Sequence, residues 1–185
     1  MNFSVFDRFP EFSTERITLQ QFELSDADAH HQLLTDPEVM MYMDGPMPKD
    51  KEEVHGKIEQ IIKDFEEQKG IIWTIKLKNQ SDMLGYFGFW RIDRKNHRVE
   101  MGYALKKEYW KQGIATEAAR LAIDFAFNEF NVHSICANIN PSNAPSRALL
   151  MKLGFRQEAY FREDYYFNGK FMDSAIFSLL VSDWK

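Results

Sequence analysis

The sequence has 185 residues, 44% of them hydrophobic and 28% charged, which is enough for a buried core in a chain near the size of one domain. Its formal net charge is −5, so no basic surplus exists to neutralise phosphates, and this argues against a general nucleic-acid binder. The single cysteine, Cys136, excludes an internal disulfide and is typical of a reducing compartment. No stretch approaches the roughly 20 apolar residues of a membrane span, and the amino terminus has no signal-peptide pattern. We therefore expect one soluble, cytoplasmic domain spanning residues 1–185.

The first part of the chain predicts a strand followed by two helices. Residues 16–22 alternate apolar and polar side chains, which indicates a half-buried strand. A helix is expected from Ser25 to about Thr35, because an Asp-Pro pair follows it. A second helix is expected from Asp50 to a stop at Gly70.

From residue 73 the hydrophobic period changes to two. Strands are expected at 73–77, 83–92 and 97–105, and their short turns make them antiparallel neighbours. A helix follows Gly113, and then come a strand at 132–139, a short helix at 143–154 and a hairpin turn at Asn168-Gly169. The fold class predicted is α/β (α+β): one mixed, mostly antiparallel central sheet flanked by helices.

The stretch EYWKQGIATEAARLAIDFAF places Gly113 where a loop passes into a helix. The first N–H groups of a helix lack intrahelical partners and carry partial positive charge, so such a junction can bind an anion. Gly113 would let a phosphate approach the backbone, and Ala115 keeps the next turn small. An ordinary strand-to-helix turn would also use a glycine, and neither a Walker loop nor a GxGxxG fingerprint is present in the sequence.

Two further features carry polar side chains near this junction. Alternation places Arg98, Glu100 and Gly102 on one face of their strand, where Glu100 is either functional or a solvated residue paired with Arg98. Asn143 and Ser146 lie at the start of the short helix, where Asn143 could simply cap it.

Together, HRVEMGYALKKEYWKQGIATEA and NPSNAPSRALLMKLGF resemble the GNAT superfamily of acyl-CoA-dependent N-acetyltransferases. The resemblance covers nearly the whole chain, and RITLQQFELSDADAHHQLLTDPEVMMYM is similar to the Rim-type branch that acetylates ribosomal-protein amino termini. It implies a sheet splayed at the cofactor cleft, acetyl-CoA as cosubstrate, and direct acetyl transfer to a primary amine in a ternary complex. In this branch the amine is a protein N-terminus. The branch often dimerises, so the resemblance leaves a homodimer as one option.

The resemblance also implies roles for individual residues. Gly113 and Ala115 match the family's pyrophosphate loop, whose first position, usually Arg or Gln, is Trp110 here. The residues implied to contact acetyl-CoA are Tyr103, Ala104, Leu105, Lys111, Gln112, Gly113, Ile114, Ala115, Thr116 and Asn143. The residues considered for the 3′-phosphate are Lys111, Arg147 and Lys152.

Acetyl transfer requires the amine to lose a proton and the thiolate to leave. Glu100 is our candidate base, directly or through water, and Ser146 is placed near the departing sulfur. The rival proton donors, which could equally be packed hairpin aromatics, are Tyr160, Tyr165 and Tyr166. The acceptor-binding candidates are Tyr42, Asp44, Met47, Trp90 and Tyr165.

Two other functions stay open: acetylation of a small-molecule amine (antibiotic, polyamine or amino acid), and a non-catalytic CoA-binding module. Glu100 and Ser146 favour an enzyme, because binding alone would not require them. Cys136 could be a nucleophile, but a buried apolar role is the ordinary one for such a cysteine. The five histidines show no metal-ligand spacing, so no metal is expected, nor is a nucleic-acid or membrane partner.

Overall fold

The computed structural model describes residues 1–43 and 45–185. Its strands are β1 (Phe12–Ser13), β2 (Ile17–Gln21), β3 (Ile71–Leu77), β4 (Met83–Asp93), β5 (Arg98–Leu105), β6 (Ser134–Ile139), β7 (Arg156–Phe167) and β8 (Lys170–Leu180). Its α-helices are α1 (Ala27–Thr35), α2 (Pro37–Met40), α3 (Lys51–Glu66), α4 (Ile114–Asn128) and α5 (Ala144–Lys152). Its 3₁₀ turns are η1 (Phe3–Phe6), η2 (Leu24–Asp26) and η3 (Lys107–Tyr109).

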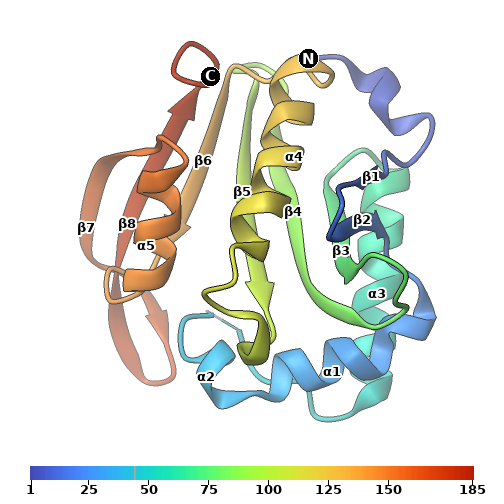
Figure 1. The fold of residues 1–185 in the computed structure, drawn as a ribbon. Coiled ribbons are helices and arrows are strands. Elements are labelled where there is room, and N and C mark those ends of the chain that lie inside the picture. The colour runs from blue at the N-terminus through green and yellow to red at the C-terminus, as the bar shows by residue number, and fades with distance from the viewer. Residues whose placement is uncertain (44) are drawn as a thin grey trace.

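The described strands form one 8-stranded sheet in the order β1-β2-β3-β4-β5-β6-β8-β7. The neighbours are antiparallel except β5 and β6, which are parallel. In Figure 1, α4 lies across β4 and β5, and α5 lies over the β6–β8 side of the sheet. The predicted mixed, mostly antiparallel sheet with flanking helices is therefore confirmed.

The Asp36-Pro37 pair does more than end α1, and this was not predicted. The Asp36 side chain accepts a hydrogen bond from the Glu38 N–H at 2.8 Å and so caps α2, with Pro37 at its first position. Before the other end of α1, Asp26 completes the capping box of the 3₁₀ turn η2, and its side chain makes no cap bond to α1 itself. Its Oδ2 accepts from the Glu23 N–H at 3.0 Å.

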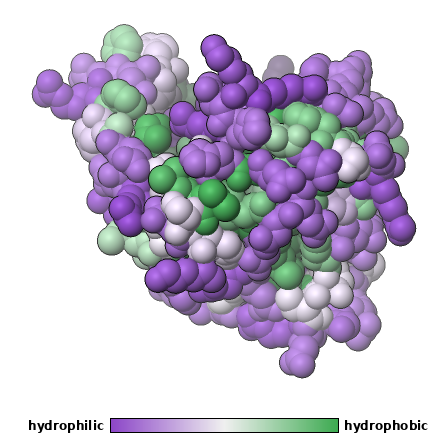
Figure 2. All heavy atoms as spheres, turned by 90° about the horizontal axis from the view of Figure 1, so that it is seen from above, coloured by the Kyte–Doolittle hydropathy of each residue, from purple (hydrophilic) through white to green (hydrophobic). Residues whose placement is uncertain are grey.

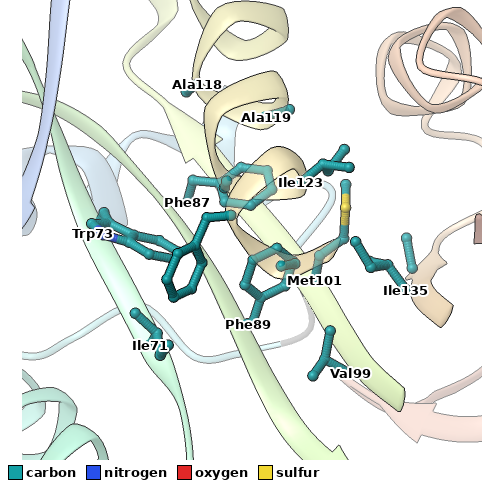
Figure 3. Packing of buried hydrophobic residues seen from close by; sticks show 14 of the residues in the cluster. Ile71, Trp73, Phe87, Phe89, Val99, Met101, Ala118, Ala119, Ile123 and Ile135 are labelled. Atoms are coloured by element: carbon teal, nitrogen blue, oxygen red, sulfur yellow. The ribbon is translucent and has the colours of Figure 1, made fainter. Parts of the chain in front are cut away.

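The larger core cluster lies between the sheet and α4 (Figure 3). Trp73, Phe87 and Phe89 are fully buried and meet edge to face, with ring centroids 5.6–5.9 Å apart. The α4 residues above them include Ala118 and Ala122, which are also fully buried. Small side chains on α4 let the helix approach the aromatic rings closely, so the amphipathic pattern after Gly113 packs as expected.

A second cluster covers the opposite face of the sheet, under α1 and α3. It joins Leu33 of α1, Val54 and Ile58 of α3, and Ala104 of β5. The two clusters hold the central strands from both sides, which explains why β4 from Met83 to Phe89 is buried except at the half-buried Tyr86.

Buried polar groups lie beside this second cluster. Asp26 and Lys76 form an ion pair at 2.8 Å, with side chains 3% and 9% exposed. His30 is buried between the rings of Phe22 and Tyr86, and its Nδ1 has no hydrogen-bond partner among the described residues. Burial, and secondarily the Lys57 charge, lowers the pKa of His30 to about 4, so this imidazole is neutral in the folded protein.

Seen from the end that carries both termini, the surface is mainly hydrophilic with hydrophobic side chains visible in its centre (Figure 2). No helix in the described part of the chain has the length and apolar character needed to cross a membrane.

Candidate active site

β5 and β6 separate part-way along the sheet. Their pairing comprises Arg98 with Ser134, Val99 with Ile135 and Glu100 with Cys136. Figure 1 shows the two strands together at one end and apart at the other. Beyond Glu100, the β6-facing backbone groups of β5 have no partner strand in the described structure. This is the splay that the GNAT resemblance implies.

The loop before α4 runs beside this opening. Lys111 and Gly113 both have left-handed backbone conformations, with φ of 59° and 81°. The N-cap Gly113 has no side chain to cap α4. The first backbone hydrogen bond of the helix is donated by the Glu117 N–H to the Gly113 carbonyl at 3.0 Å. The amides of the first turn are thus left for an external acceptor. A Cβ built on Gly113 would meet one described atom within 4 Å, the Arg16 Nη2 at 3.6 Å, so an anion has room here.

Arg16 is a residue at this loop that the sequence did not reveal. Its Nε donates to the Glu117 Oε2 at 2.8 Å, and its Nη1 donates to the Gln112 carbonyl at 3.2 Å. Thr14 donates to the other oxygen of Glu117. Glu117 lies in the first turn of α4, where its charge would oppose a second anion, and the guanidinium offsets that charge.

Trp110, which stands where the family has Arg or Gln, points into the protein. Its indole donates to the Leu105 carbonyl at 2.8 Å, and its ring packs against both core clusters. Of the three β5 residues expected to contact acetyl-CoA through their backbone, Leu105 therefore has its carbonyl already engaged. Trp110 acts on the opening by fixing the end of β5.

Glu100 lies at the last β5–β6 pair, with a side chain that is 17% exposed. The Trp90 indole donates to its Oε1 at 3.3 Å, and Arg91 donates to its Oε2 at 2.8 Å. The sequence alternative paired Glu100 with Arg98, but the ion pair that the structure shows is with Arg91. The β4–β5 register shifts between Trp90 and Asp93, and Arg91 has φ of 49°, so a bulge turns Arg91 toward the carboxylate.

Ser146 is buried in the first turn of α5 and has two neighbours. Its N–H donates to the Asn143 Oδ1 at 3.0 Å, so Asn143 does cap the helix. This leaves the Asn143 Nδ2 as the group able to meet a ligand. The Ser146 hydroxyl lies 2.8 Å from the Tyr103 hydroxyl. Burial raises the pKa of Tyr103 to about 12, and the bond to Ser146 acts in the opposite sense.

Glu100 and Ser146 approach the opening from opposite faces of the sheet. Tyr103 stacks on Phe87 within the α4-side cluster, with ring centroids 6.1 Å apart and an interplanar angle of 7°. Ala104, one residue on, belongs to the cluster under α1 and α3. Because a strand alternates its faces, Glu100 shares the face of Ala104, away from the Tyr103–Ser146 pair.

The acceptor candidates are placed less completely. Trp90 contacts Glu100 directly, as described above. Tyr42 lies in the turn after α2 and Tyr165 lies in β7 opposite Met172, and both remain predictions. Met47 is exposed, and Asp44 lies outside the described residues.

The remaining candidates have other surroundings. Tyr160 donates a hydrogen bond to Asp173 of β8, and this bond raises the pKa of the phenol. Tyr166 is exposed and meets Phe171 edge to face. Cys136 is buried, and burial raises the pKa of its thiol, which disfavours a nucleophilic thiolate. No group of three or more metal-type side chains occurs among the described residues.

The chain belongs to the GNAT acetyltransferase family, because the model of the acetyltransferase (GNAT) domain matches residues 16–156. It is 37% identical over 172 residues to the uncharacterised N-acetyltransferase p20 of Bacillus licheniformis, covering 92% of this chain and 96% of that one. It is 28% identical over 107 residues to the [ribosomal protein uS5]-alanine N-acetyltransferase of Escherichia coli, covering 57% and 55%. The solved ribosomal-protein-S5-alanine acetyltransferase of Vibrio fischeri has a TM-score of 0.82 and 25% identity, covering 95% and 99%. The protein is thus an acetyl-CoA-dependent N-acetyltransferase.

Proposed function

We propose that the acceptor is the N-terminal amine of a protein, and that acetyl-CoA and this amine meet where β5 and β6 separate. The observation that carries the proposed place of the reaction is the position of Glu100. This carboxylate lies at the last β5–β6 pair and is held by Trp90 and Arg91. The two relatives named as ribosomal-protein alanine acetyltransferases support a protein acceptor.

The residues around the opening fit acetyl-CoA. The open space at Gly113 and the first-turn amides of α4 suit the pyrophosphate, and the β5 backbone at Tyr103, which faces away from β4, suits the amides of the pantetheine arm. The Asn143 Nδ2 is a further donor for the arm. When bound, acetyl-CoA supplies an acetyl group activated as a thioester.

In this proposal the two faces of the sheet have different tasks. The Glu100 carboxylate removes a proton from the acceptor ammonium, directly or through a water, because only the free amine is a nucleophile. Trp90 and Arg91 hold both carboxylate oxygens in place for that step. On the other face, the Ser146 hydroxyl donates a hydrogen bond to the departing sulfur and so stabilises the thiolate. Direct transfer in one ternary complex follows, because both groups reach the same opening.

A panel of acceptors tests the proposal. The purified protein would be incubated with acetyl-CoA and one of three acceptors: a peptide with a free Ala or Ser N-terminus, the same peptide blocked at its N-terminus but carrying an internal Lys, or spermidine. Mass spectrometry would locate the acetyl group. We expect acetylation of the free α-amine alone. A higher kcat/KM for spermidine would select the small-molecule alternative, and CoA binding without transfer to any amine would select the non-catalytic one.

A further inference from the structure

The Tyr103 and Ser146 hydroxyls form a contact across the opening between β5 and α5. They lie 2.8 Å apart although 43 positions separate them in the chain. Tyr103 belongs to the part of β5 that has no β6 partner, so this contact connects the free end of the strand to the start of α5. The resemblance to the family gave Tyr103 a backbone role, and its hydroxyl was left without one.

The chemistry of the two hydroxyls sets the direction of the hydrogen bond. Each hydroxyl has one proton and two acceptor lone pairs. A phenol is the more acidic donor and an aliphatic hydroxyl the better acceptor, so Tyr103 donates to the Ser146 oxygen. Because burial raises the pKa of Tyr103 to about 12, the phenol keeps its proton at any pH near neutrality.

This direction leaves the Ser146 proton free for a third group. We propose that Tyr103 is a positioning residue that holds the Ser146 hydroxyl so that its proton points at the sulfur of acetyl-CoA. Stacking on Phe87 fixes the phenol ring, and the first turn of α5 fixes the Ser146 backbone. The inference rests on the proposed function of Ser146 and adds the residue through which Ser146 is oriented.

Bound CoA reports on this arrangement without any acceptor. The thiolate of CoA absorbs in the ultraviolet, so its titration in the complex gives the acid dissociation constant of the bound thiol. A hydrogen bond from Ser146 stabilises the thiolate, and Tyr103→Phe, which keeps the stacked ring, would lose that orientation. We expect the acid dissociation constant of the bound thiol to fall about fivefold in Tyr103→Phe and in Ser146→Ala, because the thiolate loses its hydrogen bond in both. In the double variant the acid dissociation constant should fall no further than in Ser146→Ala alone.

Tyr86→Phe is the matched control, since Tyr86 is a half-buried tyrosine, like Tyr103, and lies on the other face of the neighbouring strand, opposite Ala104. It should leave the thiol titration unchanged. A Tyr103→Phe titration equal to that of the wild type, or additive losses in the double variant, would overturn the inference. Failure of the proposed function has a different signature: the thiol titrations differ as expected while no α-amine is acetylated. Failure of CoA to bind would contradict both.

Discussion

The ring of Trp90 lies across the backbone of Gly102, at a distance that leaves no room for a side chain. A Cβ on Gly102 would come within 2.2 Å of the indole Cη2. This contact holds the indole where its N–H reaches Glu100. Gly102 therefore helps to orient Glu100, the candidate base, because it leaves the space that the Trp90 indole occupies.

Gly102→Ala should displace the indole and lower both stability and turnover. Overpacking of this kind destabilises by about 1–3 kcal/mol, which urea unfolding would measure. Gly56→Ala is the control, because Gly56 lies in α3 with nothing within 4 Å of its Cβ position. Alanine should stabilise that helix by about 0.5–1 kcal/mol. If Gly102→Ala matched Gly56→Ala in stability and the wild type in turnover, the contact would have no role.

Glu100→Gln should lower kcat by about 100-fold or more while the affinity for acetyl-CoA stays unchanged. The amide keeps an oxygen for the Trp90 indole but cannot take a proton from the amine. Steady-state kinetics and calorimetry would separate the two effects. Glu59→Gln, an exposed site in α3, controls for the loss of one negative charge. Wild-type turnover of Glu100→Gln at every pH would remove Glu100 from the mechanism.

The Arg16–Glu117 pair should tune the affinity for CoA. Arg16→Ala leaves the Glu117 carboxylate uncompensated in the first turn of α4, where we place the pyrophosphate. We expect about two- to fivefold weaker CoA binding at low salt, and recovery when Glu117→Gln is added. Calorimetric titration of the single and double variants measures this. Equal affinity of the wild type and Arg16→Ala would show that the pair has no electrostatic role.

Much of the fold follows from the sequence, because it depends on local signals. The Asn168-Gly169 turn, the Asn143 cap and the two-residue period from Trp73 each describe residues close in the chain, and the structure has all three. The position of Gly113 at the start of α4 was also predictable, since a left-handed N-cap favours glycine.

The contacts that orient the candidate groups were not predictable, because they depend on register and distant segments. The bulge after Trp90 decides that Arg91, and not Arg98, meets Glu100. Arg16 reaches Glu117 from a segment 101 positions away. No periodicity reports either relationship.

His30 should make the stability of the protein depend on pH. Its pKa is lowered from 6.5 to about 4 in the folded state, so the unfolded chain binds the proton more readily. The free energy of unfolding therefore keeps its full value, as far as His30 is concerned, above about pH 6.5. It falls as the pH drops toward 4, by at most about 3 kcal/mol.

Urea unfolding at pH 7 and pH 4.5 would detect it. His30→Leu should lose less stability on acidification than the wild type, because it has no imidazole to protonate. His31→Leu, at the neighbouring and less buried position, should retain the wild-type loss. The same acid-induced loss in His30→Leu and the wild type would assign the effect to other groups.

Calorimetric titration of CoA into Gly113→Ala and Gly154→Ala tests the location of the cofactor site most directly. Both glycines have left-handed backbones, with φ of 81° and 91°, and in both the nearest described atom to a new Cβ is 3.6 Å away. The two variants therefore carry similar strain, about 1–2 kcal/mol, but only Gly113 lies in the loop that we assign to the pyrophosphate. We predict that Gly113→Ala binds CoA at least about tenfold more weakly than the wild type and that Gly154→Ala binds it normally. Wild-type affinity in a folded Gly113→Ala variant would contradict the assignment of the site.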